Sequence, residues 1–355
     1  GGDDVGSQNS LVVDNEDNLH CVYFDCSNNS LKYAFKTSND WTIEAVNQVE
    51  EGGESPEIVL DSNGNPHICY INRASSLLYY VYKDSSNWVR EVVDSVHPGS
   101  HCSIDLTSLD VPIIAYNKPG EERLYIGTRT SGSWVSETVD VDSCPVMGIK
   151  LQVPGSDELH VCYFSENNEI VYIKKQYESW LPVYNSDVDC FSNRLVFELV
   201  NNQLSYIVTT DNYKLNVHLG TGSGWQEVQY ENANIQCHSV IGHCIDSQQA
   251  IHFVYPHRLS YVSYLKLHES SWQYEHFYDD DIYSSSLGYY LNGSDVESVV
   301  YSTGNPGSWY LLQNNLGCWE ENLIVGELHG SGLFATVDSQ SRIHCSYRTG
   351  FDLIY

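Results

Sequence analysis

Histidine, tyrosine and aspartate recur together at spacings that could support proton transfer. Histidine lies three residues before tyrosine in the pairs His20–Tyr23, His67–Tyr70, His160–Tyr163, His252–Tyr255 and His344–Tyr347. Aspartate lies six residues before four of these histidines, at Asp14, Asp61, Asp246 and Asp338. Imidazole, phenol and carboxylate groups serve as general acids and bases. A catalytic group is needed once, however, whereas a packing group is needed in every repeat. We therefore expect these residues to be structural, with each aspartate capping a hairpin turn.

Residues that differ between repeats are better candidates for binding. Arginine is scarce, yet arginine and histidine occur in the loops predicted at one end of the strands. The candidate ligand-binding residues are Arg73, Arg123, Arg258, Arg348, His101, His238 and His257. The planar guanidinium group suits a carboxylate or sulfate, so the set predicts a ligand that carries such a group. The alternative is that these side chains pair with surface carboxylates in ordinary solvated loops.

Two other chemistries were weighed for the same loops. Cysteines enter three successive repeats at matching places, and with the loop histidines they would suggest a soft metal such as zinc or copper: Cys144, Cys190 and Cys237. No ligand pair has a diagnostic spacing, so we expect no metal and no cofactor. Paired carboxylates could flank a sugar, at Glu121, Glu122 and 279–281. With 47 acidic residues some must lie close together, so no catalytic residue is assigned.

The elements that must position these residues follow a sequence repeat of about 46 residues. Seven tryptophans are separated by 47, 46, 46, 45, 47 and 47 residues, namely Trp41, Trp88, Trp134, Trp180, Trp225, Trp272 and Trp319. A second series has nearly the same period: Tyr23, Tyr70, Tyr116, Tyr163, Tyr206, Tyr255, Tyr301 and Tyr347. Two independent series with one period indicate a repeat architecture.

The clearest repeat, residues 55–95, predicts four antiparallel strands at 57–60, 67–71, 77–82 and 88–93. An Asn-Gly pair between the first two strands predicts a tight hairpin with positive φ angles. Four strands in a period of this length is the size of one propeller blade. We therefore predict an all-β, eight-bladed β-propeller of four-stranded antiparallel blades, forming a single domain over residues 1–355. The approximate blades are 10–53, 54–100, 101–146, 147–192, 193–238, 239–285, 286–332 and 333–355 plus 2–8.

The closure of the last blade rests on the N-terminus. The eighth repeat stops after its third strand, which would leave a sheet edge exposed. We expect residues 2–8 to supply the missing outer strand. The alternatives are a sequence that was cut before its true last strand, or a seven-bladed propeller with extra strands.

The repeat resembles those of a known group of propellers. The pattern Asp-x-Asn-Gly-x-Pro-His-x-x-Tyr, followed by a Tyr-rich strand and a Trp-led strand, resembles the repeats of sialidase-like propellers of the BNR or Asp-box type. The resemblance covers the whole chain and implies the fold. The Asp-box itself, Ser-x-Asp-x-Gly-x-x-Trp, is not matched, and the arginine triad and Tyr–Glu pair of sialidases do not map onto this sequence. The resemblance therefore implies no activity.

Composition limits the partners. There are 47 acidic and 17 basic residues, a formal net charge of -30, which repels nucleic acids and anionic membrane surfaces. No apolar run approaches the roughly 20 residues that span a bilayer, so we expect no membrane insertion. The cysteine count of 11 is odd, so at least one thiol is unpaired. Two Asn-x-Ser sequons, at Asn28 and Asn292, favour a secreted or cell-surface protein.

Three functions remain open at this stage. The leading hypothesis is a non-catalytic extracellular propeller that binds glycans or proteins through its loop face. The second is a carbohydrate-active enzyme, either a glycoside hydrolase or a polysaccharide lyase that uses histidine and tyrosine as acid and base. The third is a structural or assembly subunit whose acidic rim contacts other copies. The oligomeric state is left open.

Overall fold

The fold is that of a computed structural model, which describes the chain except for a set of short segments. Those segments are 1–4, 38–40, 48–51, 97–100, 119–120, 122, 140–144, 187–194, 202–203, 212–213, 222–223, 231–241, 258–260, 269–270, 278–286, 292–296, 303–308, 316–317, 326–329, 338–342, 350–351 and 355. In the part described, strands form seven four-stranded antiparallel sheets and one three-stranded sheet. The same part contains no helix capable of spanning a membrane. The all-β prediction with four-stranded blades is confirmed.

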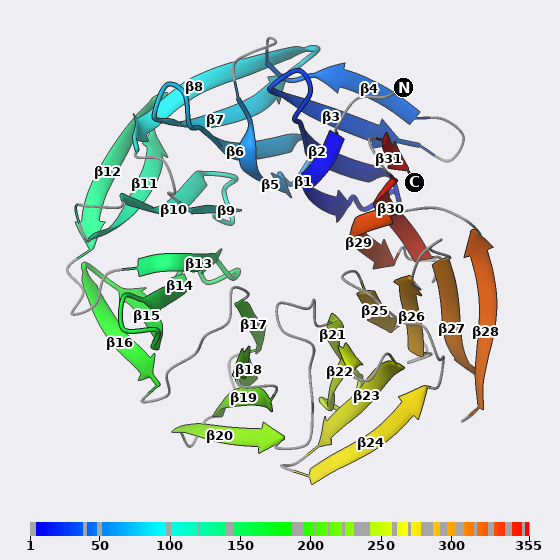
Figure 1. The fold of residues 1–355 in the computed structure, drawn as a ribbon. Helices are drawn as coiled ribbons and strands as arrows, with labels where there is room; N and C mark the ends of the chain where they lie inside the picture. Colours follow the sequence, from blue (N-terminus) through cyan, green and yellow to red (C-terminus); the bar gives the residue numbers. More distant parts are fainter. Residues whose placement is uncertain are drawn as a thin grey trace. The chain divides into compact units, whose positions relative to one another are not determined.

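The chain divides into two compact units, which we treat separately. The N-terminal unit comprises Gln8–Asp211 and Asn216–Glu227, and the C-terminal unit comprises Gly1–Ser7, Asn212–Leu215 and Val228–Tyr355. Within each four-stranded sheet, neighbouring strands follow chain order (Figure 1). We number the sheets first to eighth along the chain.

The N-terminal unit holds almost all of the first five sheets. These are β1 (Val5–Val13), β2 (Leu19–Asp25), β3 (Ser30–Lys36) and β4 (Trp41–Ala45); β5 (Glu54–Leu60), β6 (Pro66–Asn72), β7 (Leu77–Asp84) and β8 (Asn87–Ser95); β9 (Cys102–Leu106), β10 (Pro112–Lys118), β11 (Arg123–Thr130) and β12 (Ser133–Val139); β13 (Pro145–Gln152), β14 (Leu159–Ser165), β15 (Ile170–Gln176) and β16 (Ser179–Asn185); β17 (Val196–Asn201), β18 (Leu204–Asp211), β19 (Lys214–Thr221) and β20 (Gly224–Tyr230). The second sheet confirms the four strands predicted for residues 55–95, each observed strand extending one to three residues beyond at least one predicted end.

The C-terminal unit holds the remaining sheets. These are β21 (Gly242–Ile245), β22 (Ile251–His257), β23 (Tyr261–His268) and β24 (Ser271–Phe277); β25 (Leu287–Leu291), β26 (Glu297–Ser302), β27 (Trp309–Asn315) and β28 (Cys318–Val325); β29 (Gly330–Val337), β30 (Ile343–Thr349) and β31 (Asp352–Ile354). The last sheet is the three-stranded one, in the order β29-β30-β31.

Hydrophobic clusters join consecutive sheets of the N-terminal unit. One cluster combines Val22 and Leu31 of the first sheet with Ile68 and Val81 of the second. Equivalent clusters join the second sheet to the third, the third to the fourth and the fourth to the fifth. Each of these sheets is therefore buried against its sequence neighbours, so its second strand is buried on both faces, as in β6, where all seven residues are buried. Continuous burial explains why these strands lack strict alternation.

In five of the sheets, the described turn between the first two strands places one residue in the left-handed region. That residue is Asp17, Gly64, Asp110, Asp157 or Gln249, with φ of 63°, 80°, 59°, 60° and 64°. The Asn-Gly pair was expected to use positive φ angles, and only its glycine does. The reason is that the turn is closed by Asp61 over five residues: Gly64 N donates to Asp61 O at 2.9 Å and Asp61 N donates to Asn65 O at 3.0 Å.

The N-terminal segment differs from the expectation. Residues 2–4 lie outside the described part, and Val5–Ser7 begin β1, which pairs with β2 in the first sheet rather than forming a separate outer strand. The described residues thus show no fourth strand in the eighth sheet.

Candidate functional site

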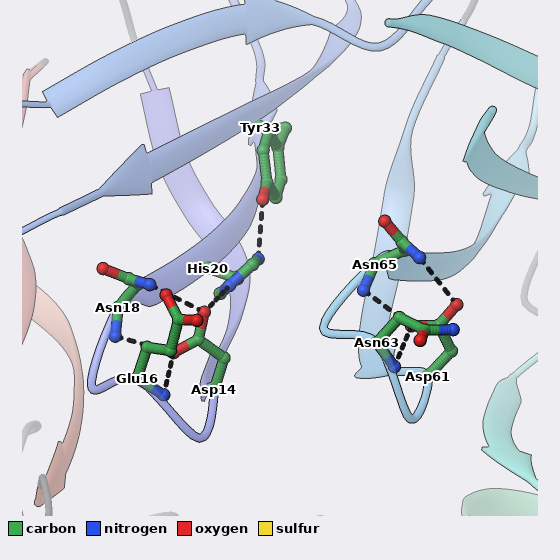
Figure 2. Close-up of polar contacts among 8 residues, drawn as sticks. All are labelled: Asp14, Glu16, Asn18, His20, Tyr33, Asp61, Asn63 and Asn65. Carbon is green, nitrogen blue, oxygen red and sulfur yellow. Dashed lines mark hydrogen bonds and ion pairs between the residues drawn. The ribbon is translucent and has the colours of Figure 1, made fainter. Parts of the chain in front are cut away.

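The recurrent Asp-His-Tyr residues form buried hydrogen-bond networks at the hairpin turns. Asp14 Oδ1 accepts from the backbone N atoms of Glu16 and Asn18, both at 2.8 Å. His20 Nε2 lies 3.3 Å from Asp14 Oδ2, and the Tyr33 hydroxyl lies 2.6 Å from His20 Nδ1 (Figure 2). The second sheet repeats the arrangement around Asp61, which accepts from the backbone N atoms of Asn63 and Asn65 (Figure 2). The sixth sheet repeats it with Asp246, His252 and Tyr264.

Burial makes these networks structural. His20 is 3% exposed and His67 is 8% exposed, and burial lowers the pKa of both imidazoles. Burial also raises the pKa of Tyr33 and Tyr80. A neutral histidine that donates from Nε2 to the aspartate and accepts from the tyrosine hydroxyl satisfies all three groups. The expectation that they are packing groups holds for the described copies.

The partner tyrosine is not the one in the sequence motif. Tyr33 lies 13 residues after His20, on the third strand, whereas the motif tyrosine Tyr23 lies three residues after it on the same strand. Residues three apart on a strand point to opposite faces, so the motif tyrosines serve another purpose. They are among the largest fully buried side chains, including Tyr70, Tyr116, Tyr163, Tyr206 and Tyr255.

A second recurrent arrangement, which we call the Glu–Trp clamp, joins neighbouring sheets. In each copy, a glutamate on the fourth strand of one sheet accepts hydrogen bonds from the tryptophan indole and a cationic side chain of the next sheet. The copies are Glu44 with Lys83 and Trp88, Glu91 with Arg129 and Trp134, and Glu137 with Lys175 and Trp180. The sequence carries a signal for this arrangement. A cation lies five residues before Trp88, Trp134 and Trp180, and each glutamate lies three residues after the tryptophan of the preceding repeat.

A further group of polar side chains gathers at the end of the third sheet where β10 turns into β11. Lys118 Nζ, at the end of β10, lies 2.8 Å from Asp94 Oδ2 of β8 and 4.4 Å from the centre of the Tyr125 ring. The Tyr116 hydroxyl donates to the same Asp94 carboxylate. Burial favours protonated Asp94, but the hydrogen bonds from Lys118 and Tyr116 outweigh it and lower the pKa of Asp94. The carboxylate is therefore charged at neutral pH.

Two exposed residues complete this group. Glu121 in the turn is exposed and accepts a hydrogen bond from the Tyr125 hydroxyl. Arg123, the first residue of β11, is exposed. Burial and Glu121 raise the pKa of Tyr125, and the positive charge of Arg123 opposes them without reversing the shift. We define the loop cluster as Asp94, Lys118, Glu121, Arg123 and Tyr125. It presents carboxylates and cations around a tyrosine that remains protonated at neutral pH.

Arg73 of the second sheet and His101 at the start of the third sheet lie near this group. Arg73 is exposed in the turn between β6 and β7, and His101 directly precedes β9. Burial first, and then the positive charge of Arg73, lowers the pKa of His101, so the imidazole is neutral at neutral pH. Asn117 holds the His101 backbone, because His101 N donates to Asn117 Oδ1 at 2.7 Å and Asn117 N donates to His101 O at 3.3 Å. The structure thus brings two predicted site residues into electrostatic contact.

The other predicted site residues lie on strands or outside the described part of the chain. Arg123 and His257 were expected in loops, but they are the first residue of β11 and the last of β22, and Arg348 lies inside β30. These strands extend further because their ladders continue to the turn, where Lys118 pairs with Arg123 and His257 with Tyr261. Nothing further is described of the His257 and Arg348 side chains, and Arg258 and His238 lie outside the described residues.

The metal hypothesis receives no support from the residues described, which contain no group of three or more potential ligands able to hold an ion. Cys144, Cys190 and Cys237 lie outside the described residues, as do Glu122 and 279–281. Within the described part, the buried cysteines Cys69, Cys102 and Cys162 form no disulfide.

Comparison with known proteins identifies the fold. No protein-family model matches the chain, and no curated protein matches its sequence. Among solved structures, the BP39L lectin from Burkholderia pseudomallei matches with a TM-score of 0.63 and 10% identity, covering 89% of this chain and 98% of the lectin. The WD40 domain of SCAP from fission yeast matches with a TM-score of 0.60 and 11% identity, covering 98% of this chain and 92% of that domain.

A polysaccharide lyase is also similar. An ulvan lyase of family PL25 matches with a TM-score of 0.57 and 10% identity, covering 92% of this chain and 94% of the lyase. The chain has a β-propeller-type fold. The likeness to sialidase-like repeats extends no further than that fold, and the diversity of these three proteins means that the fold does not determine the function.

Proposed function

We propose that the protein binds a glycan at the loop cluster and has no catalytic role there. The observation that carries the proposal is the exposed pair Glu121 and Arg123, which lie beside the buried Tyr125 and the partly buried Lys118–Asp94 ion pair. Sugar hydroxyl groups donate to carboxylates such as Glu121 and accept from cations such as Arg123 and Lys118, and these charge-assisted hydrogen bonds are the stronger ones. The similarity to the Burkholderia lectin supports the proposal at the level of the fold.

Charge favours a neutral glycan. The sequence carries a formal net charge of -30, so an anionic polysaccharide approaches against a long-range repulsion that only salt can screen. A neutral sugar meets no such barrier, and its hydroxyl groups can use the alternating signs of the loop cluster. Binding of a neutral glycan is therefore expected to vary little with ionic strength.

A glycan array followed by calorimetry on the best neutral ligand tests the proposal. We expect Arg123→Ala and Glu121→Gln each to weaken binding at least about tenfold, which corresponds to the loss of one charge-assisted hydrogen bond. Lys174→Ala is the matched control. It removes one cation near His160 in the fourth sheet, away from the loop cluster. Absence of any bound glycan, or Arg123→Ala binding like the wild type, contradicts the proposal.

One observation favours a second candidate, a polysaccharide lyase. A neutral His101 beside the charge of Arg73 could accept a proton while the guanidinium holds the carboxylate of a uronate. Incubation with uronate-containing polysaccharides and detection of unsaturated products tests this function. The lyase candidate requires that His101→Gln abolish product formation and that Lys174→Ala leave it unchanged. If the wild-type protein forms no unsaturated product, the lyase candidate is excluded.

We also propose that the eight sheets are the blades of one propeller and that the N-terminus closes it. The repeat counts support this closure, because the tyrosine series has eight members and the in-phase tryptophan series has seven. Deletion of residues 1–7 should then lower the unfolding temperature of the C-terminal sheets. An unchanged unfolding profile contradicts the closure.

For the location of the protein we propose secretion or the cell surface. The sequons at Asn28 and Asn292 in the sequence support this proposal. Fractionation of the native source tests the location.

A further inference from the structure

Two buried cysteines from neighbouring sheets of the N-terminal unit face each other. Cys69, on β6 of the second sheet, is 0% exposed, and Cys102, which begins β9 of the third sheet, is 5% exposed. Cys69 Sγ donates to Cys102 Sγ at 3.4 Å. Cys102 Sγ also donates to the Ser55 carbonyl oxygen at 3.8 Å. The two thiols are therefore in direct contact across the boundary between sheets.

The surroundings favour a covalent bond between them. Both cysteines belong to the hydrophobic cluster that joins the second and third sheets, together with Ile71, Ile104 and Tyr116. A disulfide needs an S–S distance of about 2 Å, so the sulfurs must approach by a little more than one ångström, which small rotations of two flexible side chains can supply. Apolar surroundings disfavour the thiolates, whereas a disulfide is neutral and suits this site.

We propose that Cys69 and Cys102 are the reduced form of a disulfide that joins the second and third sheets when the protein meets a disulfide oxidant such as oxidised glutathione. The Cys102 thiolate, on the more exposed residue, attacks one sulfur of the glutathione disulfide and releases one glutathione thiolate. Cys69, after losing its proton to solvent, then attacks the Cys102 sulfur and releases the second glutathione. Two protein thiols are oxidised and one glutathione disulfide is reduced.

The bond would hold the candidate site together. Cys102 directly follows His101, and Cys69 lies on β6, whose end leads into the turn that carries Arg73. A link of residues 33 positions apart restrains the unfolded chain and fixes the second sheet against the third. This inference rests on the sulfur contact and does not depend on what the site binds.

The experiment refolds the reduced full-length chain from urea in a glutathione redox buffer, so that burial does not limit access to the thiols. The sample is then acidified, alkylated and digested without reductant. We expect one linked peptide pair containing Cys69 and Cys102, at the sum of the two peptide masses less two hydrogens. The oxidised protein should unfold at a temperature roughly 5 °C above that of the reduced protein.

Variants decide whether the effect belongs to this pair. Cys69→Ser and Cys102→Ser should each remove the linked peptides and the thermal shift. Cys162→Ser is the matched control, because Cys162 is also a fully buried free thiol on the second strand of its sheet. It should change neither readout. Alkylation of both cysteines in the refolded wild type, linkage of either one to another cysteine, or a thermal shift that persists in Cys102→Ser overturns the proposal.

Discussion

Replacement of Glu91 tests whether the Glu–Trp clamp stabilises the contact between sheets. Glu91 accepts from Arg129 Nε at 2.9 Å, from Arg129 Nη2 at 2.8 Å and from the Trp134 indole at 3.0 Å. The side chains are 27% exposed for Arg129 and 19% for Glu91, so solvent screens part of the attraction. We assign about 1 kcal/mol to the screened ion pair and about 1 kcal/mol to the indole that loses its acceptor. Glu91→Ala should therefore cost about 2 kcal/mol, and Glu91→Gln about half as much.

The pH dependence of this effect has a definite sign. The hydrogen bonds from Arg129, the largest cause, lower the pKa of Glu91. A carboxyl with a lowered pKa contributes stability that is present above its unfolded pKa and lost as the pH falls through its folded pKa. In urea titrations followed by tryptophan fluorescence, the difference between the wild type and Glu91→Gln should be full at neutral pH and shrink below about pH 4.

Two controls accompany the Glu91 variants. Glu178→Gln removes a charge from an exposed turn and should leave the unfolding midpoint unchanged. Glu137→Gln removes a more exposed copy of the clamp, since the Glu137 side chain is 42% exposed, and should cost less than Glu91→Gln. Two results would refute the stabilising role of the clamp. One is an unfolding midpoint of Glu91→Ala equal to that of Glu178→Gln. The other is a stability difference between the wild type and Glu91→Gln that stays constant across this pH range.

Two further predictions concern the fifth sheet. A Cβ added at Gly220 would lie 2.7 Å from Trp225 Cζ2, so Gly220→Ala should destabilise the protein by roughly 1–3 kcal/mol in urea titrations. Gly155→Ala is the control, because a Cβ added there meets no atom within 4 Å. Equal unfolding midpoints for the two variants would disprove the crowding at Gly220. Burial lowers the pKa of His218 to about 4, so the unfolded state takes up a proton that the folded state does not between pH 6.5 and 4. Stability should fall over that window as the pH drops, and His218→Gln should reduce the slope by one proton; an unchanged slope would contradict it.

The repeat was predictable because its causes are local. Strand patterns, turn residues and the tryptophan spacing reflect contacts within one sheet or between consecutive sheets. The four strands of the second sheet follow from residues 55–95 alone. The capping role of Asp61 was predictable for the same reason, because its hydrogen bonds reach only two to four residues along the chain.

The candidate site was only partly predictable. Arg73, His101 and Arg123 were selected from the sequence, but Lys118 and Asp94 were not, because their contact joins two sheets. The pairing of His20 with Tyr33 was not predictable for the same reason. A partner on the next strand depends on the strand register, which the spacing within a motif does not contain.

By itself, the sequence determined an all-β chain of repeated antiparallel sheets, and it separated repeated packing residues from the variable residues of the loops. Only the tertiary structure decided which side chains meet across the boundaries between sheets: Glu91 with Arg129 and Trp134, Lys118 with Asp94, and Cys69 with Cys102. The physical reason is that contacts within a hairpin follow from chain connectivity, whereas contacts between sheets depend on how two buried faces pack in three dimensions.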